Sequence, residues 1–277
     1  MITKKKNENS ADLHYGAAGI DRLYGRVWGD SIHFGIYDAT TTDLEAAVVE
    51  TKRQMAVFAG LKSKCRVLEV ASGWGATARY LARAHGAHIT ATNIEHDHSS
   101  AAVRLSEMSG LERLVSHAHA DFHELAFDDN QFDVWWCQEA TVHAQDKRKV
   151  FQEALRVLKP GGRIVFSDQT TERSACTGSE SACLAARHGS DDLYSRGDFT
   201  AALYEAGFID INSTDWGQHM AHHFGELVSR IERTYDELVR DISEETIKSN
   251  LSLWRFGHEL ALRKAIGWSC FVGYKPT

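Results

Sequence analysis

The stretch from Cys65 to Arg79, C-R-V-L-E-V-A-S-G-W-G-A-T-A-R, constrains the fold of this chain more than any other. It predicts a short buried strand at Arg66 to Val70, a turn at Gly73 and Gly75, and an Ala-rich helix after the turn. A strand that ends at glycines and continues into a helix leaves backbone N–H groups free at the helix N-terminus, and the missing Cβ atoms let a ligand approach the backbone. The pattern predicts a ligand site, although a tight turn without a ligand also fits two glycines.

Strands and helices alternate downstream of this turn. The expected strands are His88–Asn93, Leu114–His119, Phe132–Cys137 and Arg163–Ser167, with helices at Asp97–Ser109 and Lys147–Leu158 between them. Such alternation is typical of a doubly wound parallel sheet, which binds its ligands at the carboxyl ends of the strands. Two later strands are expected near Ile209–Trp216 and at Trp268–Tyr274.

Helical segments flank this α/β core on both sides. Those expected before it are Asp12–Val27 and Asp43–Ala59, and those after it are Asp198–Ala206, His219–Arg240 and Glu244–Arg263. Residues 169–193 are polar and show no clear period. We therefore expect an N-terminal helical cap over residues 1–62 and a core over 63–277, with lid insertions at about 169–197 and 218–263.

Composition excludes several classes of partner. The chain of 277 residues has a formal net charge of −7, which argues against a nucleic-acid surface, because phosphate binding needs clustered Lys and Arg. No apolar stretch is long enough to span a bilayer. The five cysteines are scattered and show no C-x-x-C spacing. Such a set indicates reduced thiols in a cytoplasmic protein.

The ligand at the glycine turn is not defined by the turn alone. The string G-W-G-A-T-A fits the relaxed G-x-G-x-x-A pattern of dinucleotide-binding domains. Such a domain usually has an acidic residue about 20 positions further on, which holds the ribose diol. Here the second strand ends at Asn93, with Glu95 two residues later. Three classes of protein fit this pattern: a nicotinamide-dependent oxidoreductase, a non-catalytic nucleotide-binding module, and an enzyme that binds another nucleoside-containing ligand.

Three further features narrow the choice. Asp121-Phe122 ends the third strand and offers an acceptor for an exocyclic amine and a face for a purine, although an Asx-turn beside a core phenylalanine also fits. Gln138-Glu139 follows the fourth strand and places polar groups where a reacting atom would lie. The string V-L-K-P-G-G-R-I-V-F-S-D predicts a helix, a Pro-Gly-Gly turn and a strand in direct succession.

The chain resembles the S-adenosylmethionine-dependent methyltransferases with a Rossmann-like core in a series of motifs that follow one another in order. These motifs are E-V-A-S-G-W-G, T-N-I, A-D-F, F-D-V-W-W-C-Q-E and V-L-K-P-G-G. The resemblance implies S-adenosylmethionine as cofactor and a seven-stranded, mostly parallel sheet with an antiparallel last strand. Ala71 departs from the family pattern, which has glycine there, and Asn93 occupies a position that usually holds an acid. The implied cofactor-binding residues are Glu69, Gly73 and Gly75 at the methionine end, Asn93 and Ile94 at the ribose, Asp121 and Phe122 at the adenine, and also Trp28, Arg79 and Gln138.

The flanking segments resemble the sarcosine/dimethylglycine N-methyltransferases of glycine betaine synthesis. The similar strings are D-R-L-Y-G-R-V-W-G-D-S-I-H-F-G-I-Y, A-R-Y-L, C-Q-E-A-T-V-H and H-H-F. Phosphoethanolamine N-methyltransferases share part of this pattern. The resemblance implies methyl transfer to the amine of a small amino acid, with Tyr24 and His143 as a catalytic pair and Tyr15, Arg187 and His222 as substrate-binding residues.

These residue types suit the implied chemistry. Methyl transfer from a sulfonium is an in-line displacement, in which orientation can contribute ~7–11 kcal/mol. An amine acceptor must first lose a proton, which His143 can accept. The ring faces of Tyr24 and Trp28 favour a sulfonium, and Arg187 suits a carboxylate. The H-x-x-H-H string at residues 219–223 has the spacing of metal ligands, but no Cys or carboxylate motif accompanies it, so no metal is expected.

The identity of the methyl acceptor stays open at this level. Phosphoethanolamine, or an oxygen or carbon atom of a natural product, are alternatives to sarcosine and dimethylglycine. A bulky acceptor needs an apolar pocket, whereas residues 169–193 supply Thr, Ser, Glu and Arg. This composition favours a small polar acceptor.

Overall fold

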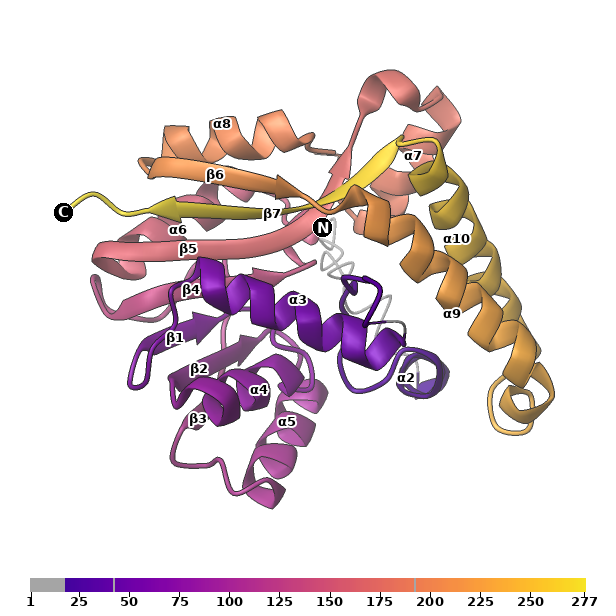
Figure 1. Cartoon of the computed structure of the whole chain (residues 1–277), viewed down its shortest axis with the longest axis horizontal. Coiled ribbons are helices and arrows are strands. Elements are labelled where there is room, and N and C mark those ends of the chain that lie inside the picture. The colour runs from indigo at the N-terminus through magenta and orange to yellow at the C-terminus, as the bar shows by residue number, and fades with distance from the viewer. Residues whose placement is uncertain (1–17, 42, 192) are drawn as a thin grey trace, which may run out of the picture.

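One twisted seven-stranded sheet forms the centre of the part of the chain that the computed structural model describes, residues 18–41, 43–191 and 193–277 (Figure 1). The strand order is β3-β2-β1-β4-β5-β7-β6. Strands β1 to β5 run parallel, and β7 is antiparallel to both of its neighbours. This confirms the predicted fold class. The strands are β1 (Arg66–Glu69), β2 (His88–Asn93), β3 (Val115–His119), β4 (Phe132–Gln138), β5 (Leu158–Thr171), β6 (Ile209–Asp215) and β7 (Ile266–Tyr274).

Helices cover both faces of this sheet. None of the described helices combines the length and the apolar character that a bilayer span requires. They are α2 (Ala18–Val27), α3 (Leu44–Phe58), α4 (Ala76–His85), α5 (His96–Met108), α6 (Lys147–Val157), α7 (Gly178–His188), α8 (Arg196–Ala206), α9 (Gly217–Leu238) and α10 (Glu244–Leu262), with short 3₁₀ helices η1 (Thr141–His143) and η2 (Arg173–Ala175).

The region after residue 168 is more regular than its sequence predicts. Strand β5 continues to Thr171, and helix α7 follows, starting at a capping box between Thr177 and Glu180. Only Leu184 and His188 of α7 are buried. A helix that buries so little of its surface shows no apolar stripe, and this is why the periodicity of the sequence missed it.

Alternation along each strand divides the core into two layers. Val67 and Trp136 face one side of the sheet and pack with residues of α2, α3, α4, α9 and α10. Leu68 and Trp135, their sequence neighbours, face the other side and pack with α6 and α8. Because α2 and α3 belong to the same apolar cluster as the sheet, residues 18–62 have no separate core. The division into a cap and a core therefore stays a prediction.

The H-x-x-H-H string joins helix α9 to the segment before α3. His223 is fully buried, and its Nδ1 lies 3.1 Å from the Gly35 amide N–H donor and 2.9 Å from the Tyr37 hydroxyl. The Nδ1 of His219 accepts from the Tyr37 amide at 3.2 Å. Burial, assisted by the charge of Arg230 and by neighbouring histidines, lowers the pKa of His223 to about 3. These contacts give His219 and His223 structural roles. Among the described residues, no three metal-ligating side chains gather into one group.

Lowering the pH from 7 to 5 is expected to reduce the free energy of unfolding by about 2 kcal/mol through His223 alone. Unfolded His223, with a pKa near 6.5, gains a proton over this range, whereas folded His223, with a pKa of about 3, does not. The unfolded state thus binds more protons, and stability decreases as the pH is lowered. Urea titrations at both pH values measure the effect in the wild type and in His223→Asn, whose Oδ1 can accept the same hydrogen bonds.

The variant His222→Asn is the matched control, since His222 is an exposed neighbour on the same helix. It should keep the pH dependence of the wild type. An undiminished pH dependence in His223→Asn would remove His223 as the cause.

Candidate active site

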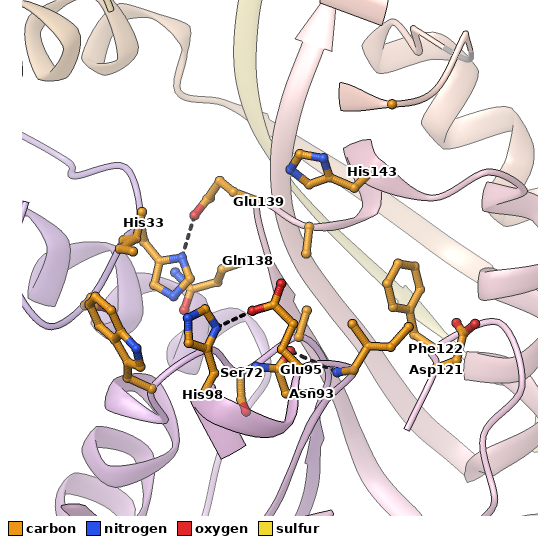
Figure 2. A pocket seen from close by; sticks show the side chains of 18 of the residues that line it. His33, Ser72, Asn93, Glu95, His98, Asp121, Phe122, Gln138, Glu139 and His143 are labelled. Atoms are coloured by element: carbon orange, nitrogen blue, oxygen red, sulfur yellow. Dashed lines mark hydrogen bonds and ion pairs between the residues drawn. The ribbon is translucent and has the colours of Figure 1, made fainter. Parts of the chain in front are cut away.

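A cavity of about 790 Å³ opens at the carboxyl ends of β1, β2 and β4 (Figure 2). In Figure 1 this edge of the sheet faces the side on which α2, α9 and α10 lie. Residues 30–33, ahead of α3, also line the cavity, as do Ala186 and Gly189 at the end of α7. The predicted site residues that line it are Gly73, Asn93, Ile94, Asp121, Phe122, Gln138 and His143. They converge because the carboxyl ends of neighbouring parallel strands meet at one edge.

The glycine turn after β1 takes the predicted form. Gly73 and Gly75 have φ angles of 52° and 72°, in the left-handed region that glycine enters without strain. Ala71 also lies in this region, with φ of 53°. Ala71 thus occupies a backbone region that favours glycine, and its Cβ adds about 1–2 kcal/mol of strain.

Glu69 and Arg79 lie beneath this turn, outside the lining of the cavity. Both are buried, and the Nη1 of Arg79 donates to the carbonyl of Trp74 at 2.6 Å. Burial raises the pKa of Glu69 to about 8, against the opposing charges of Lys52 and Arg79. The contact of Arg79 supports the turn, and direct binding of the cofactor by Glu69 and Arg79 stays a prediction.

Unpartnered donors lie on the floor of the cavity. The Oε1 of Gln138 accepts from Thr77 at 3.1 Å and from Trp136 at 3.2 Å, while its Nε2 is buried and has no partner among the described residues. The Oδ1 of Asn93 accepts from the Ile94 amide at 3.0 Å, and its Nδ2 likewise has no partner there. Buried donors without partners are rare, and a bound ligand that accepts hydrogen bonds would satisfy both. Hydroxyl and carboxylate oxygens, such as those of S-adenosylmethionine, fit them.

Asp121, Phe122 and His123 form the opposite end of the cavity. The Oδ1 of Asp121 accepts from the amide of His123 at 2.8 Å and lies 2.7 Å from its Nδ1. Burial raises the pKa of Asp121, but these hydrogen bonds outweigh it, so the net pKa lies below the usual value. The carboxyl group is thereby kept ionised as an acceptor. These hydrogen bonds of Asp121 use Oδ1, which leaves Oδ2 for the exocyclic amine of an adenine.

Asp121→Ala is expected to weaken binding of S-adenosylhomocysteine by about tenfold or more, because a hydrogen bond to a charged group contributes ~1.5–3 kcal/mol. Isothermal titration calorimetry measures the dissociation constant. Asp128→Ala, at an exposed position in the same loop, is the control and should bind as the wild type does. An unchanged dissociation constant in Asp121→Ala would contradict the adenine assignment.

His143 reaches the cavity from η1, directly after β4. Its Nδ1 lies 3.1 Å from the carbonyl oxygen of His188, which can only accept. Neutral His143 therefore carries its proton on Nδ1 in this pair, and Nε2 holds the lone pair. Buried Asp168 fixes η1 by accepting from the Thr141 hydroxyl at 2.5 Å and the Val142 amide at 2.8 Å. This tautomer is the one that a general base at Nε2 requires.

Sequence reasoning placed Glu139 near the reacting atom but missed His33, whose side chain faces that of Glu139 in Figure 2. The Nδ1 of His33 lies 2.9 Å from the Oε2 of Glu139. The Oε1 of Glu139 accepts from Ser167 at 2.5 Å and from Trp268 at 2.9 Å. Glu139 has a φ of 49°, a strained value that is typical of functional sites. In the sequence, His33 lies in an unusually aromatic segment, residues 28–38, and this composition was the signal that could have marked it as a site residue.

Tyr24 and Trp28 lie behind the cavity rather than in its lining. Their rings stack with centroids 5.7 Å apart, and each meets Trp254 edge-on. The Nε1 of Trp28 donates to the carbonyl of His33 at 2.9 Å. Trp28 thus positions the segment that carries His33. The pairing of Tyr24 with His143 stays a prediction.

The predicted substrate-binding residues differ in location. Tyr15 falls outside the described residues. Arg187 lies on α7 between Ala186 and Gly189, two residues of the lining, and its Nη1 is buried without a partner among the described residues. His222 is exposed on α9, with its ring 4.2 Å from that of Tyr37 and outside the lining. A direct contact of His222 with the substrate stays a prediction that this position does not favour.

Known proteins share this fold and much of this sequence. Residues 68–166 match the methyltransferase domain family. The chain is 31% identical over 250 residues to a glycine/sarcosine/dimethylglycine N-methyltransferase of Actinopolyspora halophila, an alignment that covers 89% of this chain and 44% of that protein. It is 28% identical to a sarcosine/dimethylglycine N-methyltransferase of Aphanothece halophytica, with 88% of this chain and 90% of that protein covered.

A solved structure of a similar protein has the same fold. The structure of a proposed sarcosine dimethylglycine methyltransferase from Galdieria sulphuraria superposes with a TM-score of 0.85 at 25% identity, and covers 92% of this chain and 96% of that chain. The chain thus spans less than half of the Actinopolyspora protein but nearly all of the other two. The cavity fits S-adenosylmethionine, and that molecule is the cofactor. The resemblance found in the sequence is confirmed, and the chain is an S-adenosylmethionine-dependent methyltransferase.

Proposed function

We propose that this enzyme transfers a methyl group to the amine of a small amino acid such as sarcosine or dimethylglycine. The observation that carries the proposal is the polar character of the cavity around the end of β4, which His33, Glu139 and His143 line and where His33 and Glu139 are paired. A carboxylate beside two imidazoles suits a small cationic amine better than an apolar acceptor. The named activities of the Actinopolyspora and Aphanothece relatives support the same class of acceptor.

Each of these side chains has a role that its chemistry allows. Glu139 attracts the acceptor's ammonium group, and its three fixed donors hold the carboxylate in one orientation. Nε2 of His143 accepts the proton that the amine must lose before its lone pair can attack. S-adenosylmethionine supplies an electrophilic methyl group on a sulfonium. Because the displacement is in-line, these residues act mainly by holding the nitrogen in line with that group.

Arg187 is the proposed partner of the acceptor's carboxylate. A guanidinium nitrogen that is buried without a hydrogen-bond partner is unusual, and its neighbours Ala186 and Gly189 reach the cavity. Arginine binds carboxylates through two parallel N–H···O bonds. An acceptor with an amine and a carboxylate would therefore contact both Glu139 and Arg187.

Transfer of an isotopically labelled methyl group tests the proposal directly. Glycine, sarcosine, dimethylglycine and phosphoethanolamine are offered to the enzyme at equal concentration, and the labelled products are separated. We expect labelling of sarcosine or dimethylglycine with the highest kcat/KM. Labelling of phosphoethanolamine alone, or of none of the four, would refute the acceptor class while leaving the cofactor unaffected.

A further inference from the structure

The end of β2 lacks the acid that a nucleoside site of this fold usually has. Asn93 stands at that position, and its Oδ1 is engaged by the Ile94 amide at 3.0 Å. Its remaining group, Nδ2, is a donor. A ribose presents two hydroxyls that donate, so its best partner is an oxygen with negative charge. Asn93 does not provide one.

Glu95, two residues later, has such an oxygen. Its side chain lines the cavity and is 12% exposed. The Oε2 lies 2.8 Å from the Nδ1 of His98, whereas Oε1 is buried and has no partner among the described residues. A charged oxygen that is shielded from water and left unpaired is costly, and this indicates a donor supplied by a ligand.

The position of Glu95 is fixed by His98, a neighbour in the wall of the cavity. His98 lies between Glu95 and Asp21, with its Nε2 3.6 Å from the Oδ1 of Asp21. The ring of Trp74, from the glycine turn, packs edge-on against His98 at 5.8 Å. Glu95 is the N-cap residue of α5 but makes no side-chain capping bond. Its carboxylate is thus oriented by His98 and is not required by the helix.

We propose that Glu95, oriented by His98, is the residue that accepts a hydrogen bond from the ribose of S-adenosylmethionine in this enzyme. In Figure 2 Glu95 lies between Gln138 and Phe122, that is, between the methionine and adenine ends of the cavity. The carboxylate of Glu95 replaces, from a position two residues later, the acid that is absent from the end of β2. The inference depends on the cofactor and not on which acceptor is methylated.

Binding of ribose-modified ligands to the free enzyme tests this assignment. Calorimetry measures the dissociation constants of S-adenosylhomocysteine and of its 2′-deoxy and 3′-deoxy ribose analogues. We expect the wild type to bind S-adenosylhomocysteine about 10- to 100-fold tighter than at least one analogue, as a hydrogen bond to a charged group predicts. In Glu95→Ala this ratio should fall to near one. S-adenosylhomocysteine then loses its hydrogen bond to Glu95, whereas the analogue without the hydroxyl has no such bond to lose.

Two further variants keep the experiment decisive. Glu107→Ala, at an exposed position near the other end of α5, should retain the wild-type ratio. If Glu95→Ala does not fold, as judged by circular dichroism, Glu95→Gln replaces it and should also reduce the ratio. A wild-type ratio in a folded Glu95 variant would overturn the proposal. A ratio that falls to one in Asn93→Ala but not in Glu95→Ala would overturn it as well and assign the ribose to Asn93.

Discussion

Replacing His143 by alanine is expected to lower kcat by about 10²- to 10⁴-fold, the usual contribution of a positioned general base. The Nδ1–H of this ring is held by the His188 carbonyl, so that the lone pair lies on Nε2 of a residue that lines the cavity. Alanine removes that acceptor without altering the glycine turn or the adenine end. Single-turnover rates with a saturating acceptor measure the loss, and calorimetry with S-adenosylhomocysteine should give the wild-type dissociation constant.

His88→Ala is the control for this experiment, because His88 is exposed at the opposite, amino end of β2. It should retain full activity. Near-normal turnover in His143→Ala would remove His143 from the mechanism. Equal losses of turnover and of S-adenosylhomocysteine binding would instead indicate a structural role for the ring.

Glu139→Gln is expected to reduce kcat/KM for the acceptor by about 10²-fold or more. Removing one member of a hydrogen-bonded charge pair in a shielded site typically changes the free energy by ~2–5 kcal/mol. The glutamine amide has the same shape as the carboxylate but carries no charge. It also replaces one acceptor oxygen by an NH₂ group, which cannot accept from the donors that surround Glu139. Steady-state kinetics with the preferred acceptor measure the effect, which should appear mainly in the KM of the acceptor.

Glu112→Gln, at an exposed position before β3, is the matched control and should be silent. Thermal unfolding of both variants separates loss of structure from loss of acceptor binding. If Glu139→Gln folds normally and its kcat/KM stays within a few-fold of the wild-type value, Glu139 does not bind the acceptor.

Much of the cavity could be predicted because its lining follows directly from strand ends. Gly73, Asn93, Asp121 and Gln138 stand at or shortly after the ends of β1, β2, β3 and β4, and in a parallel sheet these ends meet at one edge. The chain distances between them do not matter, since the sheet determines which ends are neighbours.

His33 and Glu139 show what could not be predicted in this way. They are 106 residues apart in the chain, and their 2.9 Å contact depends on how the segment before α3 folds across the sheet edge. The carbonyl of His188 that sets the tautomer of His143 comes from α7, a helix without an apolar stripe. Tyr24, predicted to pair with His143, and Trp28, predicted to bind the cofactor, pack among aromatic side chains outside the lining of the cavity, a position that spacing in the sequence does not give.

The sequence by itself determined the α/β sheet, the glycine turn and the nucleoside-type cavity of this protein, because hydrophobic period and turn chemistry act between residues that are close along the chain. Only the tertiary structure decided which polar groups face each other inside that cavity and which predicted residues lie outside it. Contacts such as those of Glu139 with His33 and of Glu95 with His98 depend on the packing of whole elements and on the direction of each side chain, and neither follows from spacing in the sequence.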